Sequence, residues 1–414
     1  MNQDLITIGK RAQIAANKLA LMNTATKNKA LLQLADDLIK NKNQIIAANQ
    51  QDLAAATQMP TKFTDRLMVN SQRIADMANG LRTIADLNDP TSQIDKGWIT
   101  KDGLQILQRR VPLGVIGIIF EARPNVTVDA TGLTFKSGNA VILRGGKEAI
   151  QTNTALVKIL RESLKKQHLP VDAVQLITDT SHAIADEMMN LTDYIDVLIP
   201  RGGRALIQRV VTTATVPVIE TGAGNCHIYI DKDADLTMAT NITVNAKVQR
   251  PSVCNAAEKL LIHRDIAAEF LPVIAKALME HGVQLRGDET ACQLVSTIRP
   301  VTDEDWETEY NDLIMAVKIV DSLDDAISHI NHYSTHHSES IITNNITRGR
   351  YFQQAINSAC VYVNASTRFT DGGEFGFGAE IGISTQKLHA RGPMGLQQLT
   401  TIKYEITGNG QIRK

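Results

Sequence analysis

Two short segments of the sequence carry side chains that could take part in covalent chemistry. In the segment 218–225, the carboxylate of Glu220 follows an apolar stretch and precedes two glycines. In the second segment, Cys254 follows Arg250 and precedes Asn255-Ala-Ala, where we expect a helix to start. A helix N-terminus and a nearby arginine both lower the pKa of a thiol, and the thiolate is its nucleophilic form. The pattern leaves two interpretations of Cys254 open: a reactive thiol, or a small buried side chain.

The other groups that could bind a metal or a nucleotide form no known motif. Cys226, Cys292 and Cys360 are widely spaced, with neither a zinc-like spacing nor the density of a disulfide framework. The segment 329–337 holds four histidines without a placed acidic partner, which favours a polar loop over a metal site. GxGxxG, the P-loop motif, HExxH and GxSxG do not occur in the sequence. We therefore expect no bound metal.

The composition excludes several classes of protein. The chain has 414 residues, and 43 basic against 44 acidic side chains give a formal net charge of −1 at pH 7. A dedicated nucleic-acid-binding protein would normally carry a basic excess. No apolar run approaches the roughly 20 residues of a membrane span, and the N-terminal residues lack the apolar core of a signal peptide. We expect a cytoplasmic protein with no nucleic-acid or membrane partner.

Hydrophobic periodicity indicates which elements must position these side chains. Residues 4–57 and 64–87 show the spacing of amphipathic helices, and 103–111 alternates as a strand does. Beyond these, continuous apolar runs alternate with helical segments at 152–166 and 183–190. The runs lie at 115–120, 140–143, 174–178, 197–199 and 216–219, then at 259–262, 316–320, 341–343 and 361–363, and a last strand is expected at 397–406. Such runs predict parallel sheets covered on both faces, with ligands at the carboxyl ends of the strands.

Six segments, in the same order along the chain, resemble the aldehyde dehydrogenase superfamily and most closely its gamma-glutamyl phosphate reductase family. They are 111–130 (VPLGVIGIIFEARPNVTVDA), 137–149 (SGNAVILRGGKEA), 199–207 (IPRGGRALI), 218–231 (VIETGAGNCHIYID), 248–263 (VQRPSVCNAAEKLLIH) and 389–401 (HARGPMGLQQLTT). The resemblance covers nearly the whole chain. It implies an α/β, aldehyde dehydrogenase-like fold with two Rossmann-like parallel-sheet lobes and a β-strand oligomerisation arm.

The resemblance also implies how the chain is divided. Residues 1–98 and 112–228 are expected to form an NADP-binding domain, and 229–363 a catalytic domain that carries the nucleophilic cysteine. The arm would comprise 99–111 and 397–409, and 364–396 would return to the nucleotide-binding lobe. Because relatives use such an arm to extend the sheet of a partner subunit, we expect a homo-oligomer.

By this resemblance, Cys254 is the nucleophile. Asn125 matches the asparagine whose side-chain amide, with the backbone N–H of the nucleophile, forms the oxyanion hole of the superfamily. Fixed donors suit the oxygen of a thiohemiacetal, which carries developing negative charge. Glu220 lies 34 residues before Cys254, a separation similar to that between carboxylate and thiol in the wider superfamily. Relatives that oxidise aldehydes use this carboxylate to activate water. Here Glu220 is expected either to transfer a proton or to have a structural or thiol-orienting role.

The superfamily binds a dinucleotide on a Rossmann-like sheet without GxGxxG, so the resemblance implies NADPH or NADP as the cofactor. Arg144 and Lys147 would bind the 2′-phosphate, although a solvated charge pair is an alternative interpretation of both. Gly202 and Gly203 stand where relatives have a glycine-bearing turn beside the pyrophosphate. Glu309 aligns with the glutamate that holds the nicotinamide ribose.

The implied substrate is L-glutamyl 5-phosphate, and Arg123, Arg250 and Arg391 could bind its phosphate in bidentate fashion. Cys254 would displace phosphate, the thioester would accept hydride from NADPH, and L-glutamate 5-semialdehyde would be released, as in proline biosynthesis. Two alternatives remain open: a hydrolytic aldehyde dehydrogenase on the same fold, and a catalytically silent binding or scaffold protein. A transient contact with glutamate 5-kinase, the enzyme that makes the labile acyl phosphate, also remains open.

Overall fold

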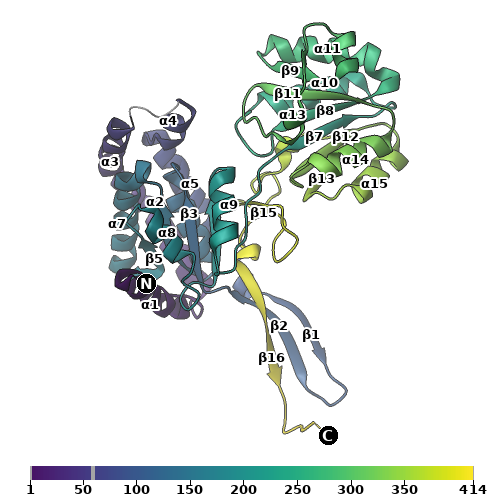
Figure 1. The fold of residues 1–414 in the computed structure, drawn as a ribbon. Coiled ribbons are helices and arrows are strands. Elements are labelled where there is room, and N and C mark those ends of the chain that lie inside the picture. Colours follow the sequence, from purple (N-terminus) through teal and green to yellow (C-terminus); the bar gives the residue numbers. More distant parts are fainter. Residues whose placement is uncertain (1, 57–60, 414) are drawn as a thin grey trace. The chain divides into compact units, whose positions relative to one another are not determined.

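The computed structural model describes residues 2–56 and 61–413, which divide into two compact units (Figure 1). The first unit consists of Met1–Thr221, Gly376–Gly382 and Met394–Lys414, and the second of Gly222–Phe375 and Ile383–Pro393. The chain therefore passes from the first unit to the second after Thr221, earlier than the expected boundary at 228. The segment 364–396, which was expected to return to the first unit, contributes most of its residues to the second.

Helices make up the start of the first unit. In the described residues they are α1 (Gln3–Leu19), α2 (Thr24–Lys40), α3 (Lys42–Ala55), α4 (Thr61–Leu67) and α5 (Ser71–Asp86). The helices predicted within 4–57 are confirmed, while residue 57 itself lies outside the described residues. The single helix predicted over 64–87 was wrong. The side chain of Asn70 accepts a hydrogen bond from the N–H of Arg73, and this cap starts a new helix.

A four-stranded parallel sheet forms the centre of the first unit, with the strand order β5-β4-β3-β6. The strands are β3 (Val115–Phe120), β4 (Ala140–Gly145), β5 (Val174–Leu176) and β6 (Val197–Arg201). They alternate with α6 (Asn125–Lys136), α7 (Ile150–Lys166), α8 (His182–Met188) and α9 (Arg204–Thr213). Every residue of β3 and β4 is buried, as the continuous apolar runs predict.

The strand predicted at 216–219 was wrong except for one bridge. Leu198 of β6 donates its N–H to the carbonyl oxygen of Pro217 at 2.8 Å and accepts from the N–H of Ile219 at 2.9 Å. These bonds leave an isolated parallel bridge at Val218. Pro217 has no N–H to donate, so it cannot take part as a donor in a longer ladder.

A seven-stranded sheet forms the second unit, and its strand pairs are parallel, in the order β10-β9-β11-β8-β7-β12-β13. The strands are β7 (Cys226–Ile230), β8 (Ala257–His263), β9 (Gln284–Gly287), β10 (Arg299–Pro300), β11 (Ile314–Val320), β12 (Ser338–Ile342) and β13 (Cys360–Val363). The helices are α10 (Leu236–Val248), α11 (Arg264–Glu280), α12 (Glu289–Leu294), α13 (Asp303–Glu307), α14 (Leu323–Tyr333) and α15 (Ile346–Ala355). The four strands predicted here are confirmed as β8, β11, β12 and β13, whereas β7, β9 and β10 were not predicted.

A separate antiparallel sheet, which we call the arm sheet, consists of β1 (Ile94–Ile99), β2 (Gln105–Pro112) and β16 (Thr400–Thr407). β2 is its central strand, since it pairs with β1 on one side and with β16 on the other. The strands predicted at 103–111 and 397–406 are confirmed, except that Gln397–Leu399 forms a 3-10 turn. β1, whose six residues are all exposed, was not predicted.

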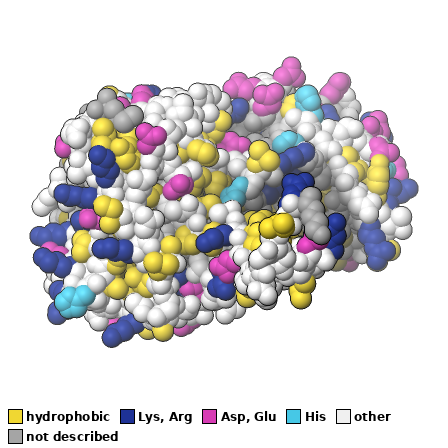
Figure 2. Space-filling view, turned by 90° about the horizontal axis from the view of Figure 1, so that it is seen from below, with side chains coloured by type: hydrophobic (Ala, Val, Ile, Leu, Met, Phe, Trp, Pro, Cys, Tyr) yellow, Lys and Arg dark blue, Asp and Glu magenta, His cyan; other side chains and the backbone are white. Residues whose placement is uncertain are grey.

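The remaining short strands are β14 (Gly382–Ser384) and β15 (Gly392–Met394). On the face seen in Figure 2, basic and acidic side chains are interspersed, in keeping with the formal net charge of −1. The architecture is thus α/β with two parallel sheets, as the sequence predicts, and the arm sheet has one strand more than the two that were predicted.

Candidate active site

Cys254 lies in a loop, residues 249–256, which connects α10 to β8 and which we call the nucleophile loop. The helix predicted to start at Asn255 was wrong. Residues from Ala257 onward form β8, which is buried at every position between β7 and β11. Pairing along both edges of a central strand outweighs the helix propensity of the two alanines. A helix N-terminus therefore cannot be the group that stabilises the thiolate of Cys254.

The backbone of Gly224 lies directly against the peptide group of Cys254. A Cβ atom on Gly224 would be 1.5 Å from the carbonyl oxygen of Cys254 and 2.7 Å from its Cα, so no side chain fits there. The N–H of Gly224 donates to Oε1 of Glu309 at 2.8 Å. Glu309, which the resemblance assigns to the nicotinamide ribose, thus accepts a hydrogen bond from the segment that touches Cys254.

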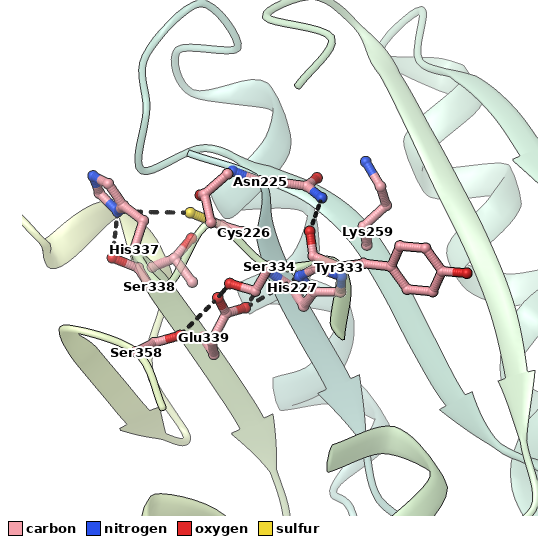
Figure 3. Close-up of polar contacts among 12 residues, drawn as sticks. Asn225, Cys226, His227, Lys259, Tyr333, Ser334, His337, Ser338, Glu339 and Ser358 are labelled. Carbon is pink, nitrogen blue, oxygen red and sulfur yellow. Dashed lines mark hydrogen bonds and ion pairs between the residues drawn. The ribbon is translucent and has the colours of Figure 1, made fainter. Parts of the chain in front are cut away.

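Cys226, the first residue of β7, has a fully buried side chain. Its Sγ donates to the carbonyl oxygen of Cys254 at 3.1 Å and lies 3.8 Å from Nδ1 of His337 (Figure 3). Nδ1 of His337 is 2.8 Å from Oγ of Ser338, which in turn is 2.7 Å from Oγ1 of Thr370. Burial raises the pKa of the Cys226 thiol well above its ordinary value, so this side chain remains a donor at neutral pH.

Asn255, the residue after the nucleophile, is held by the segment 367–370. Oγ1 of Thr367 donates to the carbonyl oxygen of Asn255 at 2.7 Å. Nδ2 of Asn255 donates to the carbonyl oxygen of Thr370 at 2.8 Å, and its Oδ1 accepts from Nη1 of Arg368. The nucleophile loop is therefore fixed on both sides of the Cys254 carbonyl group by buried or partly buried side chains.

Arg368 is a residue that the sequence analysis missed. Besides Asn255, it contacts the start of the nucleophile loop, where its Nε donates to Oε1 of Gln249 at 3.0 Å. Partial burial and the neighbouring charge of Arg250 lower the pKa of the Arg368 guanidinium, while the Cys254 side chain acts in the opposite direction. Arg368 is thus a positive charge near Cys254, and the exposed Arg250 is a second positive charge near Arg368. No motif or spacing in the sequence indicates this role of Arg368.

Arg391 also belongs to the second unit and lies just before β15, where it is partly buried. Its Nη2 donates to the carbonyl oxygen of Asn357 at 3.0 Å and to its Oδ1 at 3.1 Å. The buried Nε of Arg391 has no hydrogen-bond partner among the described residues. Its role as a phosphate ligand remains a prediction.

In the first unit, Asn125 is the first residue of α6 and is exposed. Its Nδ2 donates to Oδ2 of Asp129, one helical turn further on, at 2.9 Å. Desolvation raises the pKa of Asp129 to about 6, against the hydrogen bond from Asn125 and the positive charge of Arg201. An ionised carboxylate only accepts hydrogen bonds, so Asp129 fixes which end of the Asn125 amide faces it.

Gly202 and Gly203 form the glycine turn, residues 201–204, which joins β6 to α9. The N–H of Gly203 donates to Oε2 of Glu121 at 2.9 Å, and a Cβ atom on Gly202 would be 2.7 Å from the same carboxyl group. Gly203 is the N-cap residue of α9, where the helix dipole favours negative charge. The turn therefore fits an anionic group, and in this structure the Glu121 carboxylate takes that position.

Arg144 and Lys147 differ in their surroundings. Arg144, near the end of β4, is buried, and its Nη2 donates to the carbonyl oxygens of Thr180 and Ser181 at 2.5 and 3.0 Å. Burial lowers the pKa of the Arg144 guanidinium. Lys147 is exposed. Arg144 is thus a link between β4 and the start of α8, while Lys147 faces solvent.

Arg123 and Glu220 complete the set of predicted residues, and both are partly buried in the first unit. Arg123 lies between β3 and α6, where its N–H donates to the carbonyl oxygen of Glu121 at 2.6 Å. Glu220 precedes Thr221, whose Oγ1 donates to the carbonyl oxygen of Pro200 at 2.8 Å. The roles of Arg123 and Glu220 remain predictions.

The polar loop predicted at 329–337 was wrong for 329–333, whereas 334–337 does form a short connection before β12. His329 and His332 lie on α14, which starts at the N-cap Ser322 and continues to Tyr333. His329 and His337 are buried, because the apolar face of α14 packs on the sheet and the chain then enters β12. Within the part of the chain that the structure describes, no group of three or more His, Cys, Asp or Glu side chains could hold a metal ion.

Known proteins similar to this chain share one family. The sequence model of the aldehyde dehydrogenase family matches residues 2–300. The chain is 98% identical over 414 residues to a protein of Limosilactobacillus reuteri (strain DSM 20016) named gamma-glutamyl phosphate reductase, and the match covers 100% of both chains. The chain belongs to the aldehyde dehydrogenase family, in its gamma-glutamyl phosphate reductase branch. A protein of the same name from Lactiplantibacillus plantarum is 61% identical over 410 residues, 99% of each chain.

A solved structure agrees with this membership in the gamma-glutamyl phosphate reductase branch. The crystal structure of gamma-glutamyl phosphate reductase from Thermotoga maritima matches with a TM-score of 0.97 at 48% identity, over 100% of both chains. The predicted aldehyde dehydrogenase-like fold is thereby confirmed. Aldehyde dehydrogenases are oxidoreductases that use a nicotinamide cofactor. Among the described residues, no helix is both long enough and apolar enough to span a membrane.

Proposed function

We propose that this chain catalyses the NADPH-dependent reduction of L-glutamyl 5-phosphate to L-glutamate 5-semialdehyde, with release of phosphate, in proline biosynthesis. The observation that carries the proposal is the nucleophile loop, which presents Cys254 near the positive charges of Arg250 and Arg368. Guanidinium groups suit an acyl donor whose leaving group is phosphate, because they pair with its charged oxygen atoms. A relative that is 98% identical carries the name of this activity.

In the first step, the thiolate of Cys254 bonds to the acyl carbon and the bond from that carbon to the phosphate oxygen breaks. This leaves a thioester and inorganic phosphate. We assign Arg123, Arg250 and Arg391 to the phosphate group, whose charge the guanidinium groups offset as it departs. A cysteine suits the step because a thioester is more electrophilic toward hydride than an oxygen ester, and the thiolate leaves readily.

In the second step, Asn125 and the backbone N–H of Cys254 are assigned to the oxygen atom that becomes negative. When bound, the reduced nicotinamide supplies the hydride. One hydrogen of the Asn125 amide is donated to Asp129, so the other is left for the oxyanion. The thiohemiacetal then releases the semialdehyde and restores the thiolate. Glu220 is assigned either to proton transfer in these steps or to orientation of the thiol.

The residues proposed to hold NADP lie on both units. The glycine turn fits the pyrophosphate, because the N–H of Gly203 already donates to one anionic group, the carboxylate of Glu121. Glu309 is assigned to the nicotinamide ribose. For the 2′-phosphate we assign Lys147 and Arg144, with the larger contribution from Lys147 because it is exposed while Arg144 is bound to two carbonyl groups. Lys147→Ala should lower kcat/KM for NADPH and leave that for NADH unchanged; a wild-type enzyme that uses both equally would contradict this assignment.

An assay with glutamate 5-kinase, ATP, glutamate and NADPH tests the proposed reaction. We expect oxidation of NADPH that depends on the kinase, together with formation of the semialdehyde. Cys254→Ala and Cys254→Ser should abolish turnover, while NADPH binding and the far-ultraviolet circular dichroism spectrum remain as in the wild type. Turnover retained by Cys254→Ala would remove this residue from its role.

The oxidative direction separates the reductase from a hydrolytic aldehyde dehydrogenase. With the semialdehyde and NADP, we expect NADPH to form only when phosphate is present, because phosphate is then the group that cleaves the thioester. Formation of the free carboxylate without phosphate would indicate the hydrolytic enzyme instead. No reaction in either direction, with a folded protein, would favour the binding or scaffold alternative.

We further propose a cytoplasmic homo-oligomer that forms through the arm sheet. All six residues of β1 are exposed, and one of them, Trp98, contacts the exposed Tyr404 of β16 edge to face. Unpaired strand edges with apolar side chains are usually covered. Light scattering should give a mass above that of the monomer, and Ile99→Lys in β1 should lower it; a monomeric wild type would contradict the proposal. Copurification with glutamate 5-kinase at low salt would test the transient contact.

A further inference from the structure

The carbonyl group of Cys254 is directed at a buried thiol. The acceptor is the backbone oxygen of the nucleophile itself, and the donor is Sγ of Cys226, 3.1 Å away and fully buried. The missing side chain of Gly224 allows this approach, since a Cβ atom there would overlap the same carbonyl oxygen. Gly224 and Cys226, which are two residues apart in the same short segment, therefore both contact the peptide group of Cys254.

This hydrogen bond belongs to a closed ring of contacts around the nucleophile. From Cys226 the ring continues to His337 and Ser338, which Figure 3 shows on the adjoining part of the sheet. It then reaches Thr370 through the contact between the two hydroxyl groups, 2.7 Å apart. The carbonyl group of Thr370 accepts from the side chain of Asn255, the covalent neighbour of Cys254. The ring of contacts therefore starts and ends at the peptide group between Cys254 and Asn255.

The protons of this ring can be assigned from its chemistry. A thiol has a single hydrogen, and in Cys226 that hydrogen goes to the carbonyl oxygen of Cys254, which can only accept. When Ser338 gives its own hydrogen to Thr370, Nδ1 of His337 carries the hydrogen that points toward Cys226 and Ser338. Nε2 of His337 is buried without a partner in the described structure, which suits the nitrogen that carries no hydrogen. Burial lowers the pKa of His337 to about 4, so the ring stays neutral in this form at physiological pH.

We propose that Cys226 is a positioning residue for the nucleophile, whose thiol fixes the carbonyl group of Cys254 and thereby the directions of the Cys254 side chain and backbone N–H. The proposal rests on the function proposed above in taking Cys254 as the nucleophile. A peptide group that could rotate would turn the negative end of its carbonyl dipole toward the thiolate and oppose its formation. It would also displace the backbone N–H assigned to the oxyanion.

Three variants of Cys226 in the full-length chain test the proposal. Cys226→Ala and Cys226→Val remove the donor, and valine also fills the space, so that a folded variant is available if alanine leaves a damaging cavity. Cys226→Ser keeps a hydrogen-bond donor, the hydroxyl group, on a shorter bond to Cβ than that of the thiol. Two quantities are measured: kcat in the coupled assay, and the rate of alkylation of Cys254 by iodoacetamide between pH 5 and 10, located by peptide mass spectrometry.

We expect the alanine and valine variants to lower kcat about tenfold, the loss that one hydrogen bond of roughly 1.4 kcal/mol would cause. Their alkylation profiles should shift to higher pH, and serine should restore most of both quantities. KM for NADPH should not change. If the alanine and valine variants keep the wild-type alkylation profile and a kcat within about twofold of wild type, less than the effect of one hydrogen bond, the proposal is overturned.

Cys292 provides a matched control in the same unit. Its Sγ also donates to a backbone carbonyl oxygen, that of Gly287, at 3.4 Å, but it lies on α12 and outside the nucleophile loop. Cys292→Ala should therefore leave both readouts unchanged; an equal shift in this variant would mean that any lost thiol has the same effect. The alkylation profile needs no substrate, so it tests the positioning role even if the coupled assay shows no acyl-phosphate reduction.

Discussion

The nucleophile loop and the glycine turn are both short connections that expose backbone polar groups, yet different kinds of side chain bind those groups. In the nucleophile loop, the carbonyl groups of Cys254 and Asn255 accept from Cys226 and Thr367, whose side chains are buried. In the glycine turn, the N–H of Gly203 donates to Glu121, whose side chain is exposed. A buried donor cannot leave without disturbing the core, whereas an exposed carboxylate can give way to another anion. The comparison indicates a permanent arrangement at Cys254 and an exchangeable one at the proposed cofactor site.

Gly224→Ala should have the largest effect, because it breaks the permanent arrangement. The added Cβ would lie 1.5 Å from the carbonyl oxygen of Cys254, so the nucleophile loop must move. Since a displacement of about 1 Å can cost about 10²-fold in rate, we expect kcat to fall by at least about 10²-fold. Gly80→Ala on α5 is the control, since the atom nearest its added Cβ is 3.9 Å away. Steady-state kinetics of both variants check this, and equal activities would contradict the close contact.

Glu121→Gln tests the exchangeable arrangement at the glycine turn. A neutral amide accepts a weaker hydrogen bond from the N–H of Gly203 than the carboxylate does, so it competes less with a phosphate and does not repel it. We expect NADPH to bind about tenfold more tightly, corresponding to one charge-assisted hydrogen bond of about 1.4 kcal/mol. Fluorescence titration measures the dissociation constant. The control variant Glu162→Gln, on α7, should leave the dissociation constant unchanged. Weaker binding by the Glu121 variant would show that its carboxylate supports the cofactor site.

Thr367→Val tests a second contact of the nucleophile loop with little change in volume. The substitution removes the hydroxyl that donates to the carbonyl oxygen of Asn255 and leaves that oxygen without its donor. We expect a loss of about 1 kcal/mol in the free energy of unfolding and a few-fold lower kcat. Urea denaturation measures the free energy of unfolding, and steady-state kinetics measures kcat. The comparison variant is Thr212→Val, which removes an exposed hydroxyl on α9 that bonds only to its own helix. Equal losses in both variants would argue against a special role for Thr367.

Asp129→Asn should have the smallest effect on rate but a characteristic pH dependence. The pKa of Asp129 rises from 3.8 to about 6 in the folded chain, by desolvation. Between these values the folded state binds more protons than the unfolded state, so stability falls as pH rises and stays lower above about pH 6. The variant cannot ionise, so we expect it to unfold at higher urea concentration than the wild type at pH 7.5.

At pH values well below 3.8, where Asp129 is protonated in both states, the two proteins should have equal stability. We also expect kcat of the variant to be a few-fold lower at pH 7.5, because a neutral amide orients Asn125 less firmly than a carboxylate. Parallel stability curves for the two proteins would show that Asp129 ionises normally.

The parallel sheets could be predicted from sequence because their central strands are buried on both faces and read as continuous apolar runs. β8 and β11 are examples. β7 was not predicted because it starts with Cys226 and His227. The backbone N–H of His227 donates to the buried carboxyl group of Glu339 at 2.7 Å. A strand whose apolar residues are interrupted by a buried histidine lacks a continuous apolar run. The helix start expected at Asn255 failed for a related reason, since strand pairing outweighed local propensity.

The candidate site was predictable only in part. The resemblance located Cys254, Asn125 and the glycine turn. The contacts that hold these residues could not be predicted, because they join distant parts of the chain. Arg368 lies 113 residues from Asn255 in sequence, and Glu121 lies 82 residues from Gly203. No local pattern marks such pairs, and only the folded chain brings them together.

The arm sheet has a consequence for synthesis of the protein. Arg109 of β2 and Glu405 of β16 form an ion pair at 3.1 Å, although 296 residues separate them. At ribosomal rates of about 5–20 residues per second, β2 waits roughly 15 to 60 seconds for its second partner strand. During that time the edge of β2 opposite β1 is unpaired, and Ile94 and Ile99 of β1 are exposed. Nascent chains on neighbouring ribosomes can pair through such an edge, so we expect the yield of soluble protein to depend on chaperones that bind the β1–β2 hairpin before β16 emerges.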